Sequence, residues 1–523
     1  MHVIVGFQST RALAERLLQT IRTLSSPGFE GRAPGSRGEK RTIDYLEAKF
    51  REIGLSPGAP GGGYRQPVPL VGITPDPAMR LSFLDGKESL APRYGEEFVA
   101  WTKRLEPQVS VDAPVVFAGY GIAAPEYDWD DFAGVDVHGK VLMVLVGDPP
   151  VEGKFRDGAL TYYGRWTYKL EKAAAAGAVA CLIVHRTDTA GYPWEVVRGG
   201  WTGEQFDLRG RDPADRRLAV EGWISRAEAE HVVALAGREL ASLEKAAATP
   251  GFRALPLGIR ARIHVRSRFR NVDSANLIGR IAGSDAERSR EHIVYMAHWD
   301  HFGVRDGKVF AGAVDNASGV AGLLELARAF VDLGRPSPRS VLFLTTTAEE
   351  QGLLGSRYYA EHPAAPLAST VAAINLDGMN VHGRTTDVVL IGRGLSTADD
   401  LVERAARRRR RRVVGDPEPE KGYFFRSDHF SLAKKGVPAI HLEPGVDFIG
   451  KPPGWGLAER KRYVAEDYHK PSDVVREDWD LAGAIEDLDL LFDVGREVAT
   501  RQGVPEWKPG AEFHRPPAAR PAD

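Results

Sequence analysis

The stretch HIVYMAHWDHFG, residues 292–303, joins an apolar run to a cluster of polar side chains. Its first half resembles a buried β-strand, and the chain then continues directly into His298, Asp300 and His301. Buried strands seldom end in three groups that bind protons, water or metal ions, because such groups are costly to bury. The stretch therefore predicts a strand that delivers functional side chains to one end of a sheet.

Four further stretches place ligand-type side chains at similar positions. They are GAVDNASGVAGLLELARAF with Asp315, SVLFLTTTAEEQGLLGSRYYA with Glu349 and Glu350, STVAAINLDGMN with Asp377, and EDYHKPSD with His469. Each has an ordinary explanation when it is taken alone. An aspartate before a helix can be an N-cap, an acidic pair can complement a helix dipole, and Asp-Gly often forms a turn.

Taken together, the five stretches favour a shared site. From ANLIGRIAG onward, strands alternate with helices, which predicts an α/β layer with a mostly parallel sheet. Open sheets of this kind bind ligands at the carboxyl ends of their strands, where three of the five stretches would end. Two histidines, two aspartates and two glutamates at one place would repel strongly without cations, and a pair of divalent metals removes that repulsion.

The number of candidate ligands fits two metal ions. A catalytic zinc takes about three protein ligands, so two ions that share a bridging carboxylate need about five residues. The candidates are His298, Asp315, Glu350, Asp377 and His469. Glu349 is then left beside the metals, where a hydrolase needs a general base.

These motifs resemble the M28 family of zinc aminopeptidases. The resemblance rests on AHWDH, GAVDNASGVA, TTAEEQGLLGS, NLDG, RSDHF with GVPAIHLEPG, and DYHKPSD. It implies a mostly parallel mixed sheet flanked by helices, of the zinc-exopeptidase type. It also implies two zinc ions per chain, with other divalent metals as alternatives, and a peptide substrate whose N-terminal residues are removed.

The resemblance assigns the metal-site residues as follows. His298 and Asp377 would bind one metal, Glu350 and His469 the other, and Asp315 would bridge them. Glu349 would act as general base on a metal-bridging water.

The resemblance extends to residues around the ligands. Asp300 would orient His298, as carboxylates commonly do for metal-bound histidines. Tyr468 would stabilise the tetrahedral intermediate, and Arg426 would contact the substrate. Outside these assignments, Asp473 is expected to orient His469, and the remaining site histidines, His301 and His429, are expected to pack the pocket rim.

A β-rich inserted domain is expected before the catalytic half. Helices are predicted over residues 11–24 and over the stretch that follows Ser36, whose capping box with Glu39 starts a helix that Gly54 ends. From about residue 110 the sequence predicts mostly strands. The stretch from VVFAGYGI to VACLIVH resembles a protease-associated (PA) domain. The expected division is the N-terminal part of the peptidase domain over 1–110, the PA-like insertion over 111–265, the catalytic domain over 266–505, and a loosely ordered Pro-rich tail over 506–523.

Composition narrows the choice of partners. The chain has 523 residues, of which 43% are hydrophobic and 27% charged, and its formal net charge is −2. This balance favours neither nucleic acid nor an anionic membrane as a partner. The six-arginine run 407–412 is expected to be the solvated end of a helix. The single cysteine, Cys181, excludes an intrachain disulfide and is expected to be a buried small hydrophobe.

The sequence also bears on the cellular compartment. No apolar run reaches the roughly 18–20 residues of a membrane span. The start, MHVIVGFQST, lacks the charged and apolar regions of a signal peptide. The family resemblance nevertheless favours a secreted or periplasmic protein.

Three alternatives to an aminopeptidase share the expected scaffold. A glutaminyl cyclase of related fold generally works with a single zinc, so the five-ligand set argues against it. A non-catalytic, receptor-like binding protein would be expected to lose metal ligands, which this chain keeps. A carboxypeptidase would have the same sheet and metals, and the sequence leaves it open.

Overall fold

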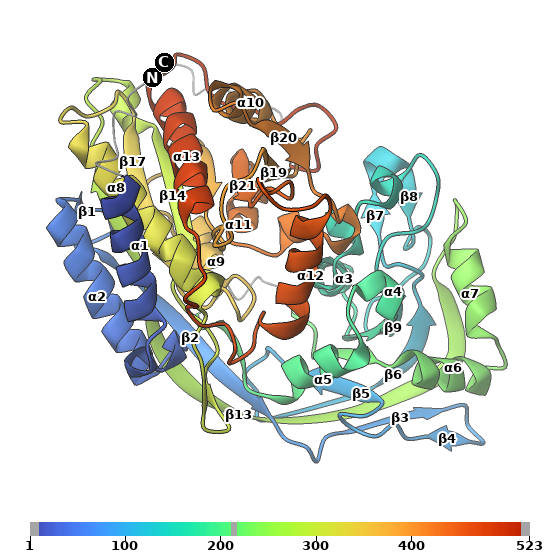
Figure 1. Cartoon of the computed structure of the whole chain (residues 1–523). Coiled ribbons are helices and arrows are strands. Elements are labelled where there is room, and N and C mark those ends of the chain that lie inside the picture. Colours follow the sequence, from blue (N-terminus) through green and yellow to red (C-terminus); the bar gives the residue numbers. More distant parts are fainter. Residues whose placement is uncertain (1–9, 211–216, 514–523) are drawn as a thin grey trace. The chain divides into compact units, whose positions relative to one another are not determined.

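The computed structural model describes residues 10–210 and 217–513, which form two compact units. Unit 1 contains residues up to 69 together with 272–417 and 426–513, and unit 2 contains residues 70–271 and 418–425 (Figure 1). The first nine residues, on which the signal-peptide prediction rests, and the last ten residues of the Pro-rich tail lie outside the described part. Among the described helices, none has both the length and the hydrophobicity that a membrane crossing needs.

Unit 1 is built on a mixed, mostly parallel sheet. Its strands follow the order β1 (Ser56–Pro57), β13 (Leu255–Ile281), β17 (Ser340–Thr346), β14 (His292–His298), β18 (Thr370–Asn375), β21 (Ala439–Glu443), β19 (Asp387–Ile391) and β20 (Arg412–Gly415). The four central strands β17, β14, β18 and β21 are parallel. At one edge of this set β13 pairs antiparallel with β17, and at the other edge β19 pairs antiparallel with β21. The predicted sheet flanked by helices is confirmed.

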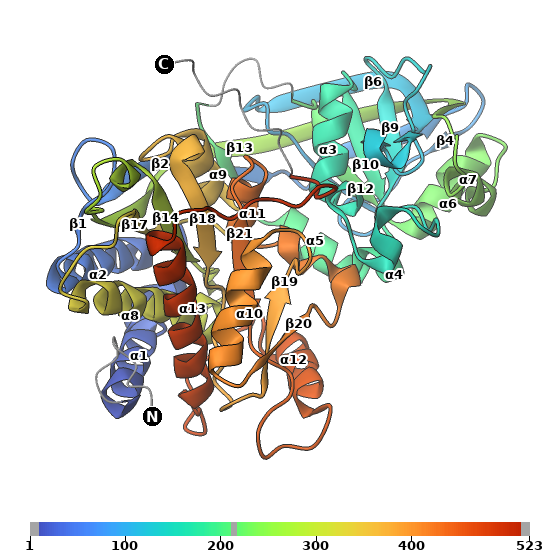
Figure 2. The ribbon, with the colours of Figure 1, turned by 90° about the horizontal axis from the view of Figure 1, so that it is seen from above.

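Helices cover both faces of this sheet (Figure 2). One face carries α1 (Thr10–Leu24), α2 (Arg37–Ile53), α8 (Gly319–Asp332) and α13 (Ala482–Thr500), and the other carries α9 (Leu354–Glu361) and α11 (His429–Ala433). Tyr295 on β14 packs under α13 and donates a 2.8 Å hydrogen bond to the carbonyl of Leu491. A Cβ atom at Gly495 would lie 1.8 Å from that hydroxyl, so the close approach of α13 requires glycine there.

The N-terminal helices form as the sequence predicts. Ser36 caps α2 by accepting a 3.1 Å hydrogen bond from the backbone N–H of Glu39, and Gly54 ends the helix with φ of 91°. The carboxylate of Glu39 does not close the capping box on Ser36. It accepts hydrogen bonds from the backbone N–H of Gly35 and from the hydroxyl of Ser274 instead.

The arginine run is more buried than expected. It follows α10 (Ala398–Arg408), and Arg409 pairs with Asp489 at 2.6 Å and with Asp493 at 2.8 Å on α13. Arg411 is only 5% exposed and pairs with Asp487 at 2.6 Å. The prediction of a solvated helix end is wrong for these two residues, because acidic side chains of α13 bind them.

Unit 2 is rich in β-structure. Its main sheet has the order β4 (Ser89–Leu90), β3 (Arg80–Leu84), β13, β6 (Gln108–Phe117), β9 (Val141–Leu145), β10 (Ala180–Val184), β12 (Val220–Ile224) and β5 (Phe98–Trp101). Its helices are α3 (Trp166–Ala175), α4 (Thr187–Ala190), α5 (Trp194–Thr202), α6 (Arg226–Leu235) and α7 (Leu240–Ala247). Cys181 on β10 is fully buried, as predicted. The unit begins earlier than residue 111, because β3 and β5 pair with β13 and β12.

Unit 2 contains a buried lysine among carboxyl groups. Lys169 on α3 is 1% exposed and donates a 3.0 Å hydrogen bond to the carbonyl of Gly147. Burial lowers the pKa of Lys169 to about 8, although Asp148 and Asp131 oppose the shift. Burial also raises the pKa of both aspartates to about 6, with Lys169 acting in the opposite direction. The ammonium group therefore stabilises two buried carboxylates.

We expect Lys169→Met to destabilise unit 2 by about 3–5 kcal/mol near neutral pH, because Asp148 and Asp131 would lose their buried cation. The loss should shrink between about pH 7.5 and about pH 5, since the folded carboxyls take up protons while the unfolded ones remain ionised. Urea unfolding at both pH values measures the difference. Lys172→Met, on the same helix, is the control and should change little. An equal loss at both pH values would contradict this account.

Candidate metal centre

The ends of neighbouring parallel strands build the site in unit 1. His298 is the last residue of β14, Glu349 and Glu350 lie in the turn after β17, and Asp377 follows β18. Because β17, β14 and β18 are adjacent and parallel, their carboxyl ends share one edge of the sheet. Asp315, just before α8, and His469, just after α12 (Trp455–Glu466), complete the group. The structure thus brings together the five predicted ligands and Glu349.

Asp315 lies between two groups of ligand atoms. Its Oδ1 is 3.3 Å from Nε2 of His298, which is 3.1 Å from Oδ1 of Asp377. Its Oδ2 is 3.2 Å from Nε2 of His469, which is 3.1 Å from Oε2 of Glu350. Ligand atoms around a tetrahedral zinc with bonds of about 2.0 Å lie about 3.3 Å apart. The two groups therefore fit two zinc ions that share Asp315.

The carboxylates of the site favour positive charge on the groups between them. Burial alone would lower the pKa of His298, but Glu349 and Asp377 raise it well above its usual value. Burial would also lower the pKa of His469, but Glu350 and Asp315 outweigh this effect and raise it to about 10. The carboxylates thus favour protonation of both imidazoles. Metal ions would supply the same positive charge in place of those protons.

Glu349 is close to the ligand groups. Its Oε2 lies 3.8 Å from Nε2 of His298, and its backbone N–H donates a 3.0 Å hydrogen bond to Oδ1 of Asp300. Burial raises the pKa of Glu349 well above its usual value, and the charges of Asp377 and Glu350 add to the effect. Its side chain is therefore a buried carboxyl group with a raised pKa beside the candidate metal ligands.

Asp300 contacts Glu349 more closely than His298. Nδ1 of His298 is 3.3 Å from the backbone oxygen of Asp300 and 3.7 Å from its carboxylate. The carboxylate is fully buried, and burial raises its pKa to about 8. It accepts the 3.0 Å hydrogen bond from the backbone N–H of Glu349 and so holds the turn that carries Glu349.

Two residues behave differently from their sequence-based expectations. His301 is fully buried, and its Nδ1 lies 2.6 Å from Oε1 of Glu350, so it orients that ligand and does not pack a rim. Asp473 accepts hydrogen bonds from the backbone N–H groups of Val314, at 3.0 Å, and Asp315, at 3.1 Å. It therefore holds the backbone at Asp315, the candidate bridging residue, whereas we expected it to orient His469.

The remaining predicted residues lie at the same sheet edge or close to it. Tyr468 is 40% exposed, and its ring stacks on that of His469 with 3.7 Å between centroids. Arg426 is partly buried and precedes two residues that bond to strand ends, since Asn375 donates to Ser427 and Thr346 donates to Asp428. His429 is fully buried and stacks on His441, with 4.8 Å between ring centroids.

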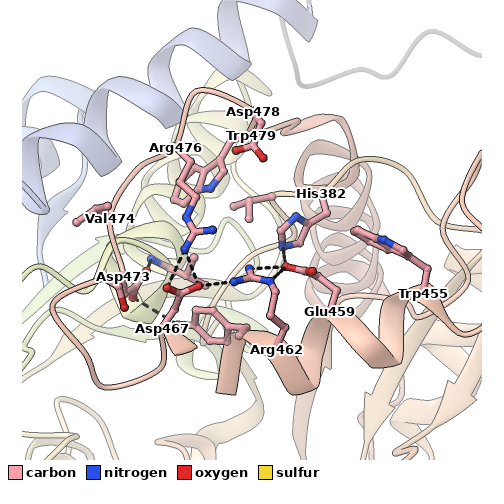
Figure 3. Close-up of a pocket in the computed structure, with 14 residues that line it drawn as sticks. His382, Trp455, Glu459, Arg462, Asp467, Asp473, Val474, Arg476, Asp478 and Trp479 are labelled. Atoms are coloured by element: carbon pink, nitrogen blue, oxygen red, sulfur yellow. Dashed lines mark hydrogen bonds and ion pairs between the residues drawn. The ribbon is translucent and has the colours of Figure 1, made fainter. Parts of the chain in front are cut away.

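A polar pocket of about 260 Å³ is lined by residues that precede and follow His469 in the chain, among them Asp467 and Asp473 (Figure 3). Arg462 donates to Glu459 at 2.8 Å and to Asp467 at 3.0 Å, and Arg476 donates to both oxygens of Asp467 at 2.7 Å. Asp473 also lines the pocket. These pairs brace the segment on both sides of His469.

Arg32 and Asp428 are two buried residues near the candidate ligands that were not among the predicted site residues. Arg32 is fully buried and donates a 2.8 Å hydrogen bond to the backbone oxygen of Trp299, between His298 and Asp300. Asp428 is also fully buried, and burial raises its pKa. The RSDHF motif pointed to Asp428, but no periodicity or motif pointed to Arg32.

Comparisons with known proteins agree with this geometry. Residues 276–492 match the model of peptidase family M28. Aminopeptidase YwaD of Bacillus subtilis is 28% identical over 377 residues, which are 68% of this chain and 62% of that protein. Aminopeptidase NAALADL1 of Mus musculus is 37% identical over 136 residues, which are 24% of this chain and 17% of that protein. The chain thus aligns with less than two thirds of either relative.

A solved structure shares the fold. The aminopeptidase from Aneurinibacillus sp. strain AM-1 matches with a TM-score of 0.51 and 22% identity, over 94% of this chain and 95% of that one. The candidate ligands, Glu349 and the other predicted site residues all lie in 276–492. The segment that builds the candidate metal centre is therefore the segment that matches the peptidase family M28 model.

Proposed function

We propose that the chain is a zinc-dependent aminopeptidase that removes N-terminal residues from peptides with two zinc ions. The observation that carries this proposal is the division of the ligands around Asp315. His298 and Asp377 would hold one zinc, and Glu350 and His469 would hold the other, at the contact distances given above. Other divalent metals with similar ligand preferences are alternatives.

When bound, zinc polarises a carbonyl and lowers the pKa of water. Glu349 would take a proton from the attacking water and pass it to the leaving amine, which is the task of a general base and acid. Asp300 supports this role, because its carboxylate accepts the backbone N–H of Glu349 at 3.0 Å. Tyr468 would donate to the tetrahedral intermediate, and Arg426 would contact the substrate.

The relatives support the same reaction. The Bacillus subtilis and Mus musculus proteins are both described as aminopeptidases, and the matched family is a peptidase family. For unit 2 we propose a PA-like domain, which the strand-rich sheet around β6, β9 and β10 supports. We assign no chemistry to this unit.

A free α-amine should be part of what the site recognises. Glu349, Glu350 and Asp377 surround the candidate metals with negative charge, which attracts an ammonium group. Removing one charge-assisted hydrogen bond costs about 1.5–3 kcal/mol, so N-acetylation should slow cleavage by roughly tenfold or more.

The test incubates zinc-loaded protein with matched free and N-acetylated peptides and follows the products by mass spectrometry. We expect stepwise loss of N-terminal residues from the free peptides. Loss from the C-terminus would instead identify a carboxypeptidase, and cyclisation of N-terminal glutamine without cleavage a glutaminyl cyclase. No change in any peptide, with zinc bound, would favour a receptor-like binding protein.

A further inference from the structure

Arg32 is a buried cation at the back of the metal centre. It is 0% exposed, and its guanidinium donates to four backbone carbonyls. Nε bonds to Trp299 at 2.8 Å, Nη1 to Leu24 at 2.8 Å and to Ala311 at 2.7 Å, and Nη2 to Gly312 at 3.0 Å. Among the ion pairs between described residues, none includes Arg32.

A buried charge without an ion-pair partner is costly unless its surroundings stabilise it. Burial lowers the pKa of Arg32 to about 10, and the acids that oppose this shift are Asp300, Asp315, Asp473 and Glu350. All four belong to the candidate metal centre or hold one of its residues. The field of the site therefore explains why a cation is tolerated there.

The backbone around Arg32 is packed tightly against the same region. Gly31 has φ of 63°, and a Cβ atom there would lie 2.4 Å from the carbonyl of Phe310 and 2.6 Å from that of Gly303. These two residues belong to the hairpin of β15 (Gly303–Arg305) and β16 (Lys308–Phe310), between the stretches that carry His301 and Asp315. The segment around Gly31 thus packs closely against the hairpin that connects these two stretches.

We propose that Arg32 is a positioning residue of the metal centre, which sets the separation of His298 from Asp315. Trp299 directly follows His298, and Ala311 and Gly312 directly precede the turn that carries Asp315. One rigid, planar guanidinium therefore joins the loops of two ligands. The inference rests on the proposed metal binding by these two residues.

The planar arrangement of the N–H donors in the guanidinium, and not its charge alone, performs this role. A lysine has a single ammonium group on a flexible stem and cannot reproduce bonds from one planar group to four backbone carbonyls. Outer partners of metal ligands typically change metal affinity by about 10–100-fold when they are replaced. Arg32→Lys and Arg32→Met should both weaken zinc binding within this range.

Arg339 provides a matched control. It is 2% exposed, and its Nη1 donates to the backbone oxygens of Val498 at 2.8 Å and Arg501 at 2.6 Å, which are not residues of the metal centre. Arg339→Met should lower the melting temperature, as Arg32→Met should, because both remove a buried guanidinium. It should leave zinc affinity within about twofold of the wild-type value.

The experiment measures zinc affinity of the full chain by competition with a chelator, below the melting temperature of every variant. Cobalt absorption spectra of the same proteins report ligand geometry. We expect weaker zinc binding and an altered cobalt spectrum for both Arg32 variants only. Arg32→Lys, the milder change, decides the question where Arg32→Met does not fold.

Wild-type zinc affinity in a folded Arg32 variant would overturn the inference. So would an equal loss of affinity in Arg339→Met, since the effect would then follow stability alone. A wild-type protein that binds no zinc would instead reject the proposed function itself, and the two failures are therefore distinguishable.

Discussion

Replacement of Glu349 by glutamine should leave both zinc ions bound and lower kcat by roughly 10²–10⁴-fold. Glutamine keeps the size of the side chain but cannot accept the proton of the attacking water. Glu349 lies 3.8 Å from His298, whereas Glu350 lies 3.1 Å from His469 and 2.6 Å from His301. From these distances we propose that Glu349 acts beside the metal ligands and that Glu350 is one of them.

Glu350→Gln is the matched control, because it changes the neighbouring residue in the same way. It should lower zinc content as well as activity, since one ligand oxygen would be replaced. Zinc content by elemental analysis and kcat on one free peptide measure both effects. If the two variants lost zinc to the same degree, the division of roles between the two glutamates would be wrong.

Replacement of Asp315 by asparagine should remove both zinc ions and reduce hydrolysis to the background rate. Its two carboxylate oxygens face different histidines, at 3.3 Å and 3.2 Å, and an amide offers only one good acceptor. Asp377→Asn, in contrast, should weaken mainly the zinc that His298 holds. Elemental analysis of the two variants beside the wild type distinguishes them.

Loss of only one zinc from Asp315→Asn would show that Asp315 serves a single metal. Because Asp315 is nearly buried, circular dichroism must show that the variant is folded before its zinc content is interpreted. A folded variant with wild-type zinc content would exclude Asp315 as a ligand.

The sequence alone predicted the positions of the candidate ligands that directly follow apolar strands. His298 and Asp377 could be placed at one sheet edge because each follows an apolar run, and adjacent parallel strands end at the same edge. Glu350 follows β17 in the same way. These positions depend on local patterns and on one topological rule.

Other residues depend on contacts between distant parts of the chain, which no local pattern reveals. Arg32 contacts carbonyls more than 260 positions away, between the candidate ligands His298 and Asp315. Arg411 is buried where Asp487 on α13 pairs with it, although a run of arginines normally indicates a solvated surface. His301 follows a strand end, where alternation no longer fixes the direction of a side chain, and it turned toward Glu350.

The extent of unit 2, which begins at Leu70, also depends on contacts between distant parts of the chain. Strands β3 and β5 precede residue 111, so the sequence grouped them with the N-terminal helices. They pair with β13 and β12, which lie more than 100 residues later in the chain. Long-range strand pairing of this kind is set by the whole sheet and not by neighbouring residues.

Zinc titration of metal-free protein tests the central claim most directly. Hydrolysis of a free peptide should rise with added zinc and reach its plateau at about two equivalents per chain, as two three-residue groups around one carboxylate require. A matched N-acetylated peptide should remain poorly cleaved throughout. Full activity at one equivalent, or in protein that contains no metal, would contradict the account.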